Sequence, residues 1–262
     1  MKIIVCVKQV IDTAARINIK NGELDTQGSS RVLNPYDEYA VEEALKIREK
    51  MPESEVTVIS VGAEGFRDTL KAGLAMGADR AIHLSDPVFE GLDNLGVAQV
   101  LAKAIRTLNY DLILCGRQAV DDDMAHVGPS LAVLLGLPFV TVITKLEIFP
   151  DLKSAVITRQ IEGGSEILET PVPVLLTCQK GLNQPRLPSL KGIMAAKKKE
   201  IQVMDAAAID FDPHVMGKEA NRLQEDKLEL PPSRKKGEIL GGSVEESASR
   251  LVQALREDEK VV

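Results

Sequence analysis

Short apolar runs alternate with helix-like segments along most of the chain, and this alternation constrains the fold more than any other feature of the sequence. A continuous apolar run is typical of a strand that is buried on both faces of a parallel sheet. Amphipathic segments of helical length between such runs indicate βαβ units, whose crossovers are right-handed. We therefore predict an α/β fold with a doubly wound, mostly parallel sheet of the flavodoxin-like or Rossmann-like kind.

The predicted elements follow one another without an internal repeat. Strands are expected at 2–7, 55–61, 80–84, 111–115 and 173–178, and helices at 35–50, 66–76, 94–108 and from Ser130 onward. Shorter strands are expected at 139–146, 155–161 and 165–168, with Glu162–Gly164 as a hairpin turn, a small hairpin around Asn21–Gly22, and a last helix at 244–255.

From Gln179 onward the composition changes and the sequence becomes polar, with prolines and lysine runs. We predict one α/β domain over residues 1–180, followed by an extended arm over residues 181–262. An arm with little core of its own needs another surface to order it, so we expect a partner protein.

Composition narrows the classes of partner. The net charge of −7 argues against nucleic acid, because neutralising phosphates requires a basic surface. No apolar run approaches the roughly 20 residues that span a bilayer, and Lys8 and Asp12 interrupt the N-terminal run, which argues against a signal peptide. Cys6, Cys115 and Cys178 lie in apolar runs and are expected as buried thiols of a reducing compartment. We expect a cytoplasmic protein.

The loop at 116–129 is the candidate ligand site. It joins the strand ending at Cys115 to the helix beginning at Ser130, and open α/β sheets bind ligands at the carboxyl ends of their strands. The carboxylates Asp121–Asp123 could hold a metal ion, although cations usually take ligands from several segments. Capping of helix amides, contact with a ribose and exposure to solvent are the other interpretations. His126 is interpreted as a ligand-side or surface residue rather than a catalytic base, and no Ser/His/Asp or Cys/His set is evident.

Five blocks of the sequence carry a resemblance to one family. The most informative is 157–177, where an arginine, an acidic-glycine turn, Glu166 and spaced prolines precede Leu-Leu-Thr. The other blocks agree in order and spacing, and they are 5–8, 33–36 with the helix at 40–44, 116–123 and 182–199. The chain closely resembles the β subunit of electron transfer flavoproteins, and the resemblance covers essentially its whole length.

This resemblance implies an electron carrier that works as a heterodimer, not an enzyme in its own right. A larger α subunit would hold the redox FAD, while the β subunit would bind a structural AMP within residues 1–180 and pack its arm, residues 181–262, on the α subunit. Electrons would come from acyl-CoA or related dehydrogenases and pass to an acceptor such as a quinone oxidoreductase. In a bifurcating, NADH-oxidising subgroup a second FAD replaces AMP. A stand-alone nucleotide-binding regulatory protein is the alternative from another class.

The resemblance also implies which residues contact the nucleotide. They are Cys6, Asn34, Pro35, Tyr36, Asp37, Val61, Gly116, Arg117, Gln118, Ala119, Val120, Asp121, Asp122, Asp123, Met124, Ala125, His126 and Val127. The phosphate would lie at a helix N-terminus, where unpaired N–H groups and the helix dipole favour an anion. Tyr36 matches a position beside the α-subunit flavin, and an ordinary tyrosine at a helix start is the alternative.

The block at 182–199 resembles the family's partner-recognition loop. Leu190 would be its apolar anchor for the dehydrogenase, exposed in a loop. Lys197 and Lys198 would steer the partner by complementary charge, whereas the default interpretation of such a run is a solvated surface. Lys191 stands where many members have proline.

Two interpretations of the nucleotide remain. Residues 127–129 and 34–37 resemble the bifurcating members, which bind a second FAD. Asp121–Asp123 resembles the AMP-binding members, because bifurcating chains tend to have glycine at the middle position, and residues 93–97 lack the threonines expected to hold a second flavin. We favour AMP.

Overall fold

The computed structural model describes residues 1–20, 22–149, 151–232, 237, 239–258, 260 and 261. Within these residues, the main sheet has nine strands in the order β11-β10-β9-β12-β8-β1-β6-β7-β13. Neighbouring strands from β9 to β13 in this order are parallel, while β9, β10 and β11 pair antiparallel. The predicted α/β fold with a doubly wound, mostly parallel sheet is confirmed.

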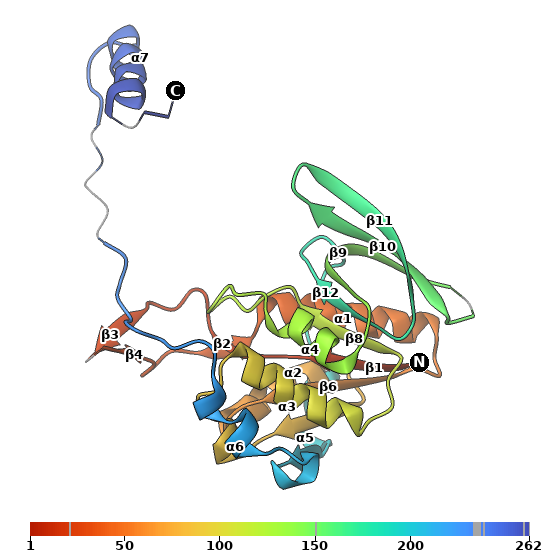
Figure 1. The fold of residues 1–262 in the computed structure, drawn as a ribbon. Helices are drawn as coiled ribbons and strands as arrows, with labels where there is room; N and C mark the ends of the chain where they lie inside the picture. Colours follow the sequence, from red (N-terminus) through yellow and green to blue (C-terminus); the bar gives the residue numbers. More distant parts are fainter. Residues whose placement is uncertain (21, 150, 233–236, 238, 259, 262) are drawn as a thin grey trace.

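Except for β13, which the sequence did not predict, the strands of the main sheet lie close to their predicted positions. The parallel part of the sheet contains β1 (Lys2–Cys6), β6 (Glu55–Val61), β7 (Arg80–Leu84), β8 (Leu112–Gly116), β12 (Val174–Cys178) and β13 (Ile201–Met204). The antiparallel part contains β9 (Phe139–Ile148), β10 (Ser154–Ile161) and β11 (Gly164–Pro171), and it projects from the body of the molecule (Figure 1).

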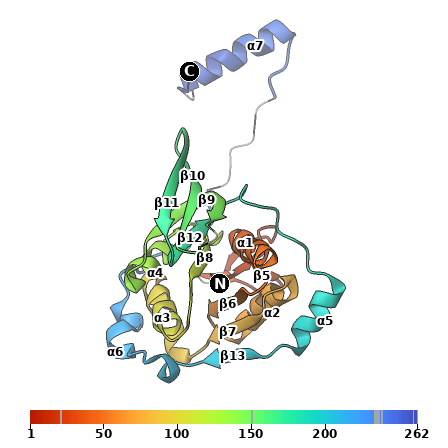
Figure 2. The ribbon, with the colours of Figure 1, turned by 90° about the vertical axis from the view of Figure 1, so that its right-hand side faces the viewer.

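Helices cover both faces of the parallel sheet (Figure 2). On one face lie α1 (Pro35–Lys50) and α2 (Arg67–Met76), and on the other lie α3 (Asn94–Arg106) and α4 (Val127–Leu135). The sequence of β1 is continuously apolar because both faces of this strand are buried. Ile3 and Val5 belong to the core under α1 and α2, whereas Ile4 and Cys6 belong to the core under α3 and α4.

The order of the strands places a topological switch point beside β1. The chain moves from β1 through α1 to β6 and then β7, and it returns through α3 to β8 on the other side of β1. Ligands of open α/β sheets bind at such a reversal, outside the carboxyl ends of the strands. Cys6 at the end of β1 lies opposite Ile59 of β6 and Cys115 of β8.

Short elements lie between β1 and α1 and after the ends of β6 and β7. Before α1, β2 (Gln9–Ile11) pairs with β5 (Arg31–Leu33), and β3 (Asn18–Lys20) pairs with β4 (Glu23–Asp25) at the predicted small hairpin, of which Asn21 lies outside the described residues. The 3-10 turns η1 (Glu64–Phe66) and η2 (Pro87–Phe89) follow β6 and β7. The helix expected from Ser130 begins earlier, at Val127, because the loop before it already turns at His126.

The C-terminal part differs from the expected extended arm. It contains α5 (Leu190–Lys198), β13, η3 (Ala207–Ile209), α6 (Pro213–Met216), η4 (Lys218–Ala220), α7 (Val244–Gln253) and η5 (Ala254–Asp258). Strand β13 pairs with β7 at the sheet edge, and Phe211 packs edge-on against Phe89 with ring centroids 5.2 Å apart. Only beyond η4 does the chain leave the body, and α7 lies apart from it in Figure 1. Among the described residues, no helix is both long and apolar enough to cross a membrane.

Candidate functional site

A cavity of about 350 Å³ lies where the carboxyl ends of β1, β6 and β8 meet, at the switch point of the sheet. This volume lies in the range of small-molecule sites, about 300–1,000 Å³. The loop after β7 and the first turns of α3 and α4 complete the walls. The geometry therefore places a ligand site where the strand order predicts one.

The loop at 116–129 contributes one wall, as the sequence predicts. Of the residues expected to contact a nucleotide, those that line the cavity are Cys6, Asn34, Asp37, Val61, Gly116, Arg117, Gln118, Ala119, Asp122, Ala125, His126 and Val127. The others lie outside its lining, and they are Pro35, Tyr36, Val120, Asp121, Asp123 and Met124.

Sequence reasoning missed the wall formed by the loops after β6 and β7. The lining residues that it did not name are Val7, Lys8, Ile59, Gly62, Ala63, Phe66, Asp86, Phe89, Glu90, Gly91, Asn94, Val97, Leu101 and Cys115, whereas Gly128 belongs to the predicted loop at 116–129. The signal was available, because loops that follow neighbouring parallel strands meet at one edge of the sheet. Applying that rule to the loops after Val61 and Leu84 would have found the lining residues of these two loops, which are Gly62, Ala63, Phe66, Asp86, Phe89, Glu90 and Gly91.

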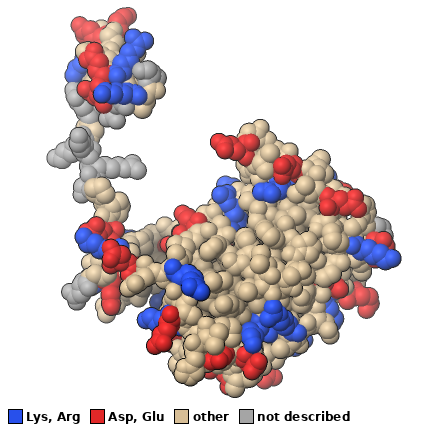
Figure 3. Space-filling view, viewed as in Figure 1, with Lys and Arg blue, Asp and Glu red and all other residues tan. Residues whose placement is uncertain are grey.

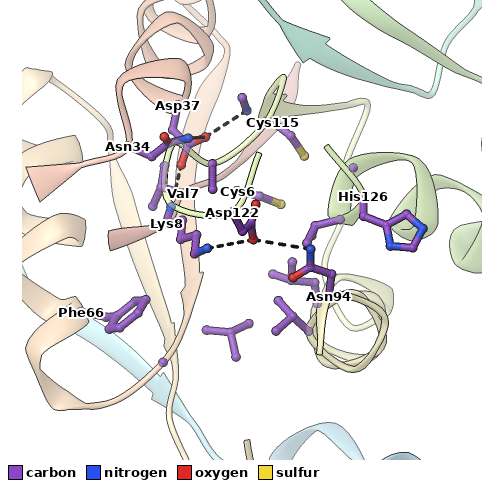
Figure 4. Close-up of a pocket in the computed structure, with 18 of the residues that line it drawn as sticks. Cys6, Val7, Lys8, Asn34, Asp37, Phe66, Asn94, Cys115, Asp122 and His126 are labelled. Carbon is purple, nitrogen blue, oxygen red and sulfur yellow. Dashed lines mark hydrogen bonds and ion pairs between the residues drawn. The ribbon is translucent and has the colours of Figure 1, made fainter. Parts of the chain in front are cut away.

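Asp37 is the buried centre that joins three chain segments at the cavity (Figure 4). Its Oδ2 accepts a hydrogen bond from the backbone N–H of Lys8 at 2.7 Å. Its Oδ1 accepts from Asn34 Nδ2 at 2.8 Å and from the backbone N–H of Gly116 at 3.1 Å. Burial raises the pKa of Asp37 to about 7, against the opposite effect of these hydrogen bonds.

Gly116 is required by this close approach. A Cβ added at Gly116 would lie 2.2 Å from Asp37 Oδ1 and 2.8 Å from the backbone N of Asp37. Only glycine lets the end of β8 approach the start of α1 so closely. Gly116 therefore serves the packing of β8 against α1.

Asn34 fixes the loop that follows β8. Its Nδ2 donates to the carbonyl oxygen of Gln118 at 2.9 Å, and its Oδ1 accepts from the backbone N–H of Val120 at 3.2 Å. An amide side chain supplies both a donor and an acceptor, which a carboxylate cannot. The start of α1 thus holds the loop that forms the opposite wall.

The three consecutive carboxylates serve contacts within the protein. Lys8 Nζ lies 2.7 Å from Asp121 Oδ1 and 3.3 Å from Asp122 Oδ2. Figure 4 shows Asp122 between Lys8 and Asn94, whose Nδ2 lies 3.5 Å from the same carboxylate. Asp123 accepts from Gln118 Nε2 at 2.5 Å. Within the described residues, no group of three or more His, Cys, Asp or Glu side chains is arranged to hold a metal ion.

Cys6 and Cys115 lie side by side on neighbouring strands and line the cavity. Both are free and buried, as predicted, and so is Cys178. The hydrogen bond with Cys6, together with burial, raises the pKa of Cys115 well above its usual value. This shift favours the neutral thiol form of Cys115 at pH 7.

The remaining cavity surface divides into an apolar and a polar part. Ile59, Phe66, Val97 and Leu101 offer apolar contacts, which suit the face of a planar ring. Arg117 and the first residues of α4, Val127 and Gly128, also line the cavity, and the Arg117 guanidinium lies 3.5 Å from Gln179 Oε1. A helix N-terminus and a guanidinium group favour an anion such as a phosphate. The cavity can therefore hold a ligand with an aromatic base at one end and a phosphate at the other.

The residues expected to dock a partner lie on a different surface. Leu190 was expected in a loop, but it is the first residue of α5. Ser189 caps this helix, because its side chain accepts a hydrogen bond from the backbone N–H of Gly192. The Leu190 side chain is nevertheless exposed. Lys197 and Lys198 lie in the last turn of α5, where cations stabilise the negative end of the helix dipole.

Comparison with known proteins identifies the family of this chain. The model of the electron transfer flavoprotein domain matches residues 22–209. The electron transfer flavoprotein subunit beta of Thermoanaerobacterium thermosaccharolyticum is 41% identical over 257 residues, covering 97% of this chain and 98% of that protein. The subunit of the same name from Bacillus subtilis is 39% identical over 264 residues, covering 100% of both chains. Subunit CarD of the caffeyl-CoA reductase-Etf complex from Acetobacterium woodii is 40% identical over 260 residues, covering 98% of both.

A match to the family model over most of the chain, with relatives of this identity along the full length, decides against the alternative of a stand-alone regulatory protein. The chain belongs to the electron transfer flavoprotein family, as a β subunit.

Proposed function

We propose that this β subunit holds AMP in the cavity at the ends of β1, β6 and β8, and that it works in a heterodimer whose α subunit carries FAD. The observation that carries the proposal is the cavity with an apolar part near Phe66 and a helix N-terminus near Arg117. The base would lie against the apolar part, and the phosphate would accept hydrogen bonds at the start of α4. In this role AMP would stabilise the loop after β8 and would take no part in covalent chemistry.

The choice of AMP over a second FAD rests on two parts of the wall. Asp122 is paired with Lys8, so neither charge is free for a longer ligand without breaking that contact. Val97 lines the cavity with an apolar side chain and offers no hydroxyl to the polar edge of a flavin ring. The alternative is a bifurcating, NADH-oxidising heterodimer with FAD in this place. The cavity's extension past β7 to Asp86 and Gly91 favours it.

The nucleotide content of the purified heterodimer tests this proposal. After denaturation, chromatography of the released cofactors is expected to give FAD and AMP in equal amounts. Two equivalents of FAD without AMP would overturn the AMP assignment and favour the bifurcating alternative. Absence of any adenine nucleotide beyond the FAD of the α subunit would overturn both.

The α subunit would cover apolar surface that this chain leaves exposed. Figure 3 shows a broad region with few charges across the middle of the body. Val133 of α4, Phe139 of β9 and Ile167 of β11 are among the exposed large apolar side chains. Exposed apolar surface is typical of a protein interface. Tyr36, half-buried at the start of α1 and outside the cavity, would lie beside the α-subunit flavin.

Electrons would come from acyl-CoA or related flavin dehydrogenases and leave to a quinone-linked or other acceptor. One relative is named as part of a complex with a CoA-ester reductase, which supports a CoA-ester oxidoreductase as a partner. We call residues 182–199 the docking segment. In it, Leu190 would insert into the dehydrogenase, while Lys197 and Lys198 would attract acidic groups around that contact.

Leu190→Ala is expected to slow electron transfer from the dehydrogenase to the heterodimer by about 30-fold at low partner concentration, the order of an interface hot spot worth about 2 kcal/mol. The flavin content should stay unchanged, because Leu190 lies far along the chain from the cavity residues and is exposed. Ile17→Ala, which removes another exposed apolar side chain, serves as the control. Stopped-flow reduction of the heterodimer measures the rate, and parallel loss of rate and flavin would contradict the docking role.

A further inference from the structure

We propose that Arg186 is a positioning residue, which holds the docking segment on α1 so that Leu187 and Leu190 are presented to the dehydrogenase in one fixed arrangement. The inference deepens the proposed function and rests on the docking role of this segment. It follows from how the segment is attached to the body on either side of these two leucines.

The first attachment is a two-carboxylate clamp around Arg186. Its Nε and one terminal nitrogen donate to the two oxygens of Glu42, at 2.7 and 2.9 Å, and its backbone N–H donates to the same carboxylate at 3.1 Å. Its other terminal nitrogen lies 2.7 Å from Glu49 Oε1. The paired geometry of a guanidinium with a carboxylate fixes orientation as well as distance. Arg186 is thereby bound to α1 at two positions about two helical turns apart.

Burial separates this clamp from the ion pairs between exposed side chains, and Glu43, 8% exposed in its pair with Lys46, is buried to a similar extent. The Glu42 side chain is 6% exposed, so little water could solvate its carboxylate if Arg186 were lost. Beside it, Asn183 Nδ2 donates to the carbonyl oxygen of Tyr39 at 3.0 Å and to Glu43 Oε2 at 2.9 Å. Removing one partner of a buried, hydrogen-bonded pair is costly because it leaves the other charge uncompensated.

The far end of the segment is attached to α2 through the backbone. A Cβ added at Gly192 would lie 2.4 Å from the carbonyl oxygen of Ala75, so α5 touches the end of α2 directly. Lys199 Nζ then donates to the carbonyl oxygen of Ala78 at 2.6 Å. The docking segment is therefore fixed before and after the residues expected to meet the partner.

Between the two attachments the segment has little apolar support. Leu187 is 91% exposed and Leu190 is 76% exposed, so neither packs on the body. A groove of about 330 Å³ separates this part of the segment from the surface formed by Val32, Ala72 and Met76. Because packing does not hold Leu187, the clamp on Arg186 positions it, and the clamp together with the contact of α5 with α2 positions Leu190. A segment ordered before binding avoids the entropy cost of ordering on the partner.

Hydrogen exchange of the heterodimer tests the clamp without any dehydrogenase. In Arg186→Gln, the backbone amides of residues 183–190 are expected to exchange about tenfold faster or more, because local opening no longer has to break the clamp. Arg186→Lys, which keeps the charge without the fork, should lie between this variant and the wild type. Arg80→Gln removes an arginine from an exposed pair with Glu55 at 3.5 Å and is the matched control. Unchanged exchange at 183–190 in Arg186→Gln would overturn the inference.

Electron transfer from a short-chain acyl-CoA dehydrogenase, reduced with butyryl-CoA, provides the second readout. Arg186→Gln is expected to raise the dehydrogenase concentration that gives half-maximal rate by roughly tenfold, while the maximal rate and the cofactor content stay within about twofold. If Leu190→Ala slows transfer and Arg186→Gln does not, the positioning role is refuted and docking stands. If exchange increases but neither variant alters transfer, the docking function itself is refuted.

Discussion

Gly116→Ala is expected to release the nucleotide from the purified heterodimer and to lower its melting temperature. The new methyl group would lie 2.2 Å from Asp37 Oδ1 and 2.8 Å from backbone atoms of Tyr36 and Asp37, which cannot rotate away as a flexible side chain can. Either β8 or the start of α1 must move, and both line the cavity. Overpacking of this kind costs about 1–3 kcal/mol, which corresponds to a fall of roughly 2–12 °C for a chain of this size.

Gly164→Ala is the matched control, because a Cβ at Gly164 meets nothing within 4 Å. Calorimetry gives the melting temperature, and chromatography of the denatured sample gives the nucleotide content. Full retention of nucleotide in Gly116→Ala, with the melting temperature of the control, would show that α1 and β8 are not held at the distance described.

Asp37→Asn is expected to destabilise the protein by about 1–3 kcal/mol for each buried N–H group that it leaves without an acceptor. Asp37 accepts from Lys8 N on one oxygen and from Asn34 Nδ2 and Gly116 N on the other. An asparagine has one side-chain oxygen, so its NH₂ group must face at least one of these donors. Chemical denaturation of the variant and of the wild type gives the difference in free energy of unfolding.

The difference in stability between the wild type and Asp37→Asn is expected to depend on pH. The pKa of Asp37 is about 7 in the folded protein, against an ordinary value of 3.8, because burial disfavours the charged form. Between these values the folded state binds more protons than the unfolded state, so the contribution of Asp37 to stability falls as pH rises, by up to about 1.4 kcal/mol per pH unit. Asparagine does not titrate. The stability advantage of the wild type over Asp37→Asn should therefore narrow from pH 5 to pH 7, and a constant difference across this range would contradict the raised pKa.

The sheet could be predicted because its signals are local. Continuous apolar runs such as that of β1 place strands that are buried on both faces, and the stretches between them have the period of a helix. Strand β13 gave no such signal. Its sequence, Ile-Gln-Val-Met, is short and alternating, and it becomes a strand because β7 offers it an unpaired edge. Tertiary context decided that assignment.

The parts of the candidate site that could be predicted are those identified by their neighbours in the sequence. The loop after β8 was found because it follows a buried strand and precedes a helix. The role of Asp37 could not be predicted, because a carboxylate in the first turn of a helix has an adequate local explanation in the helix dipole. Its real partners lie at Lys8 and Gly116, and only the adjacency of β1 and β8 brings them together. The contact of Lys8 with Asp121, across 113 positions of sequence, depends on the same adjacency.

Strand β13 also bears on how the chain is made. During synthesis β7 emerges from the ribosome long before its neighbour on the outer side, because α3, β8, α4 and β9 to β12 are all translated between them. Until residues 201–204 arrive, the N–H and C=O groups along that edge of β7 have no protein partner, and an unpaired strand edge is a template for pairing with another chain. A nascent chain that stops after β12 would therefore already hold its cavity-forming strands but would still be open to association with its neighbours on the same messenger RNA.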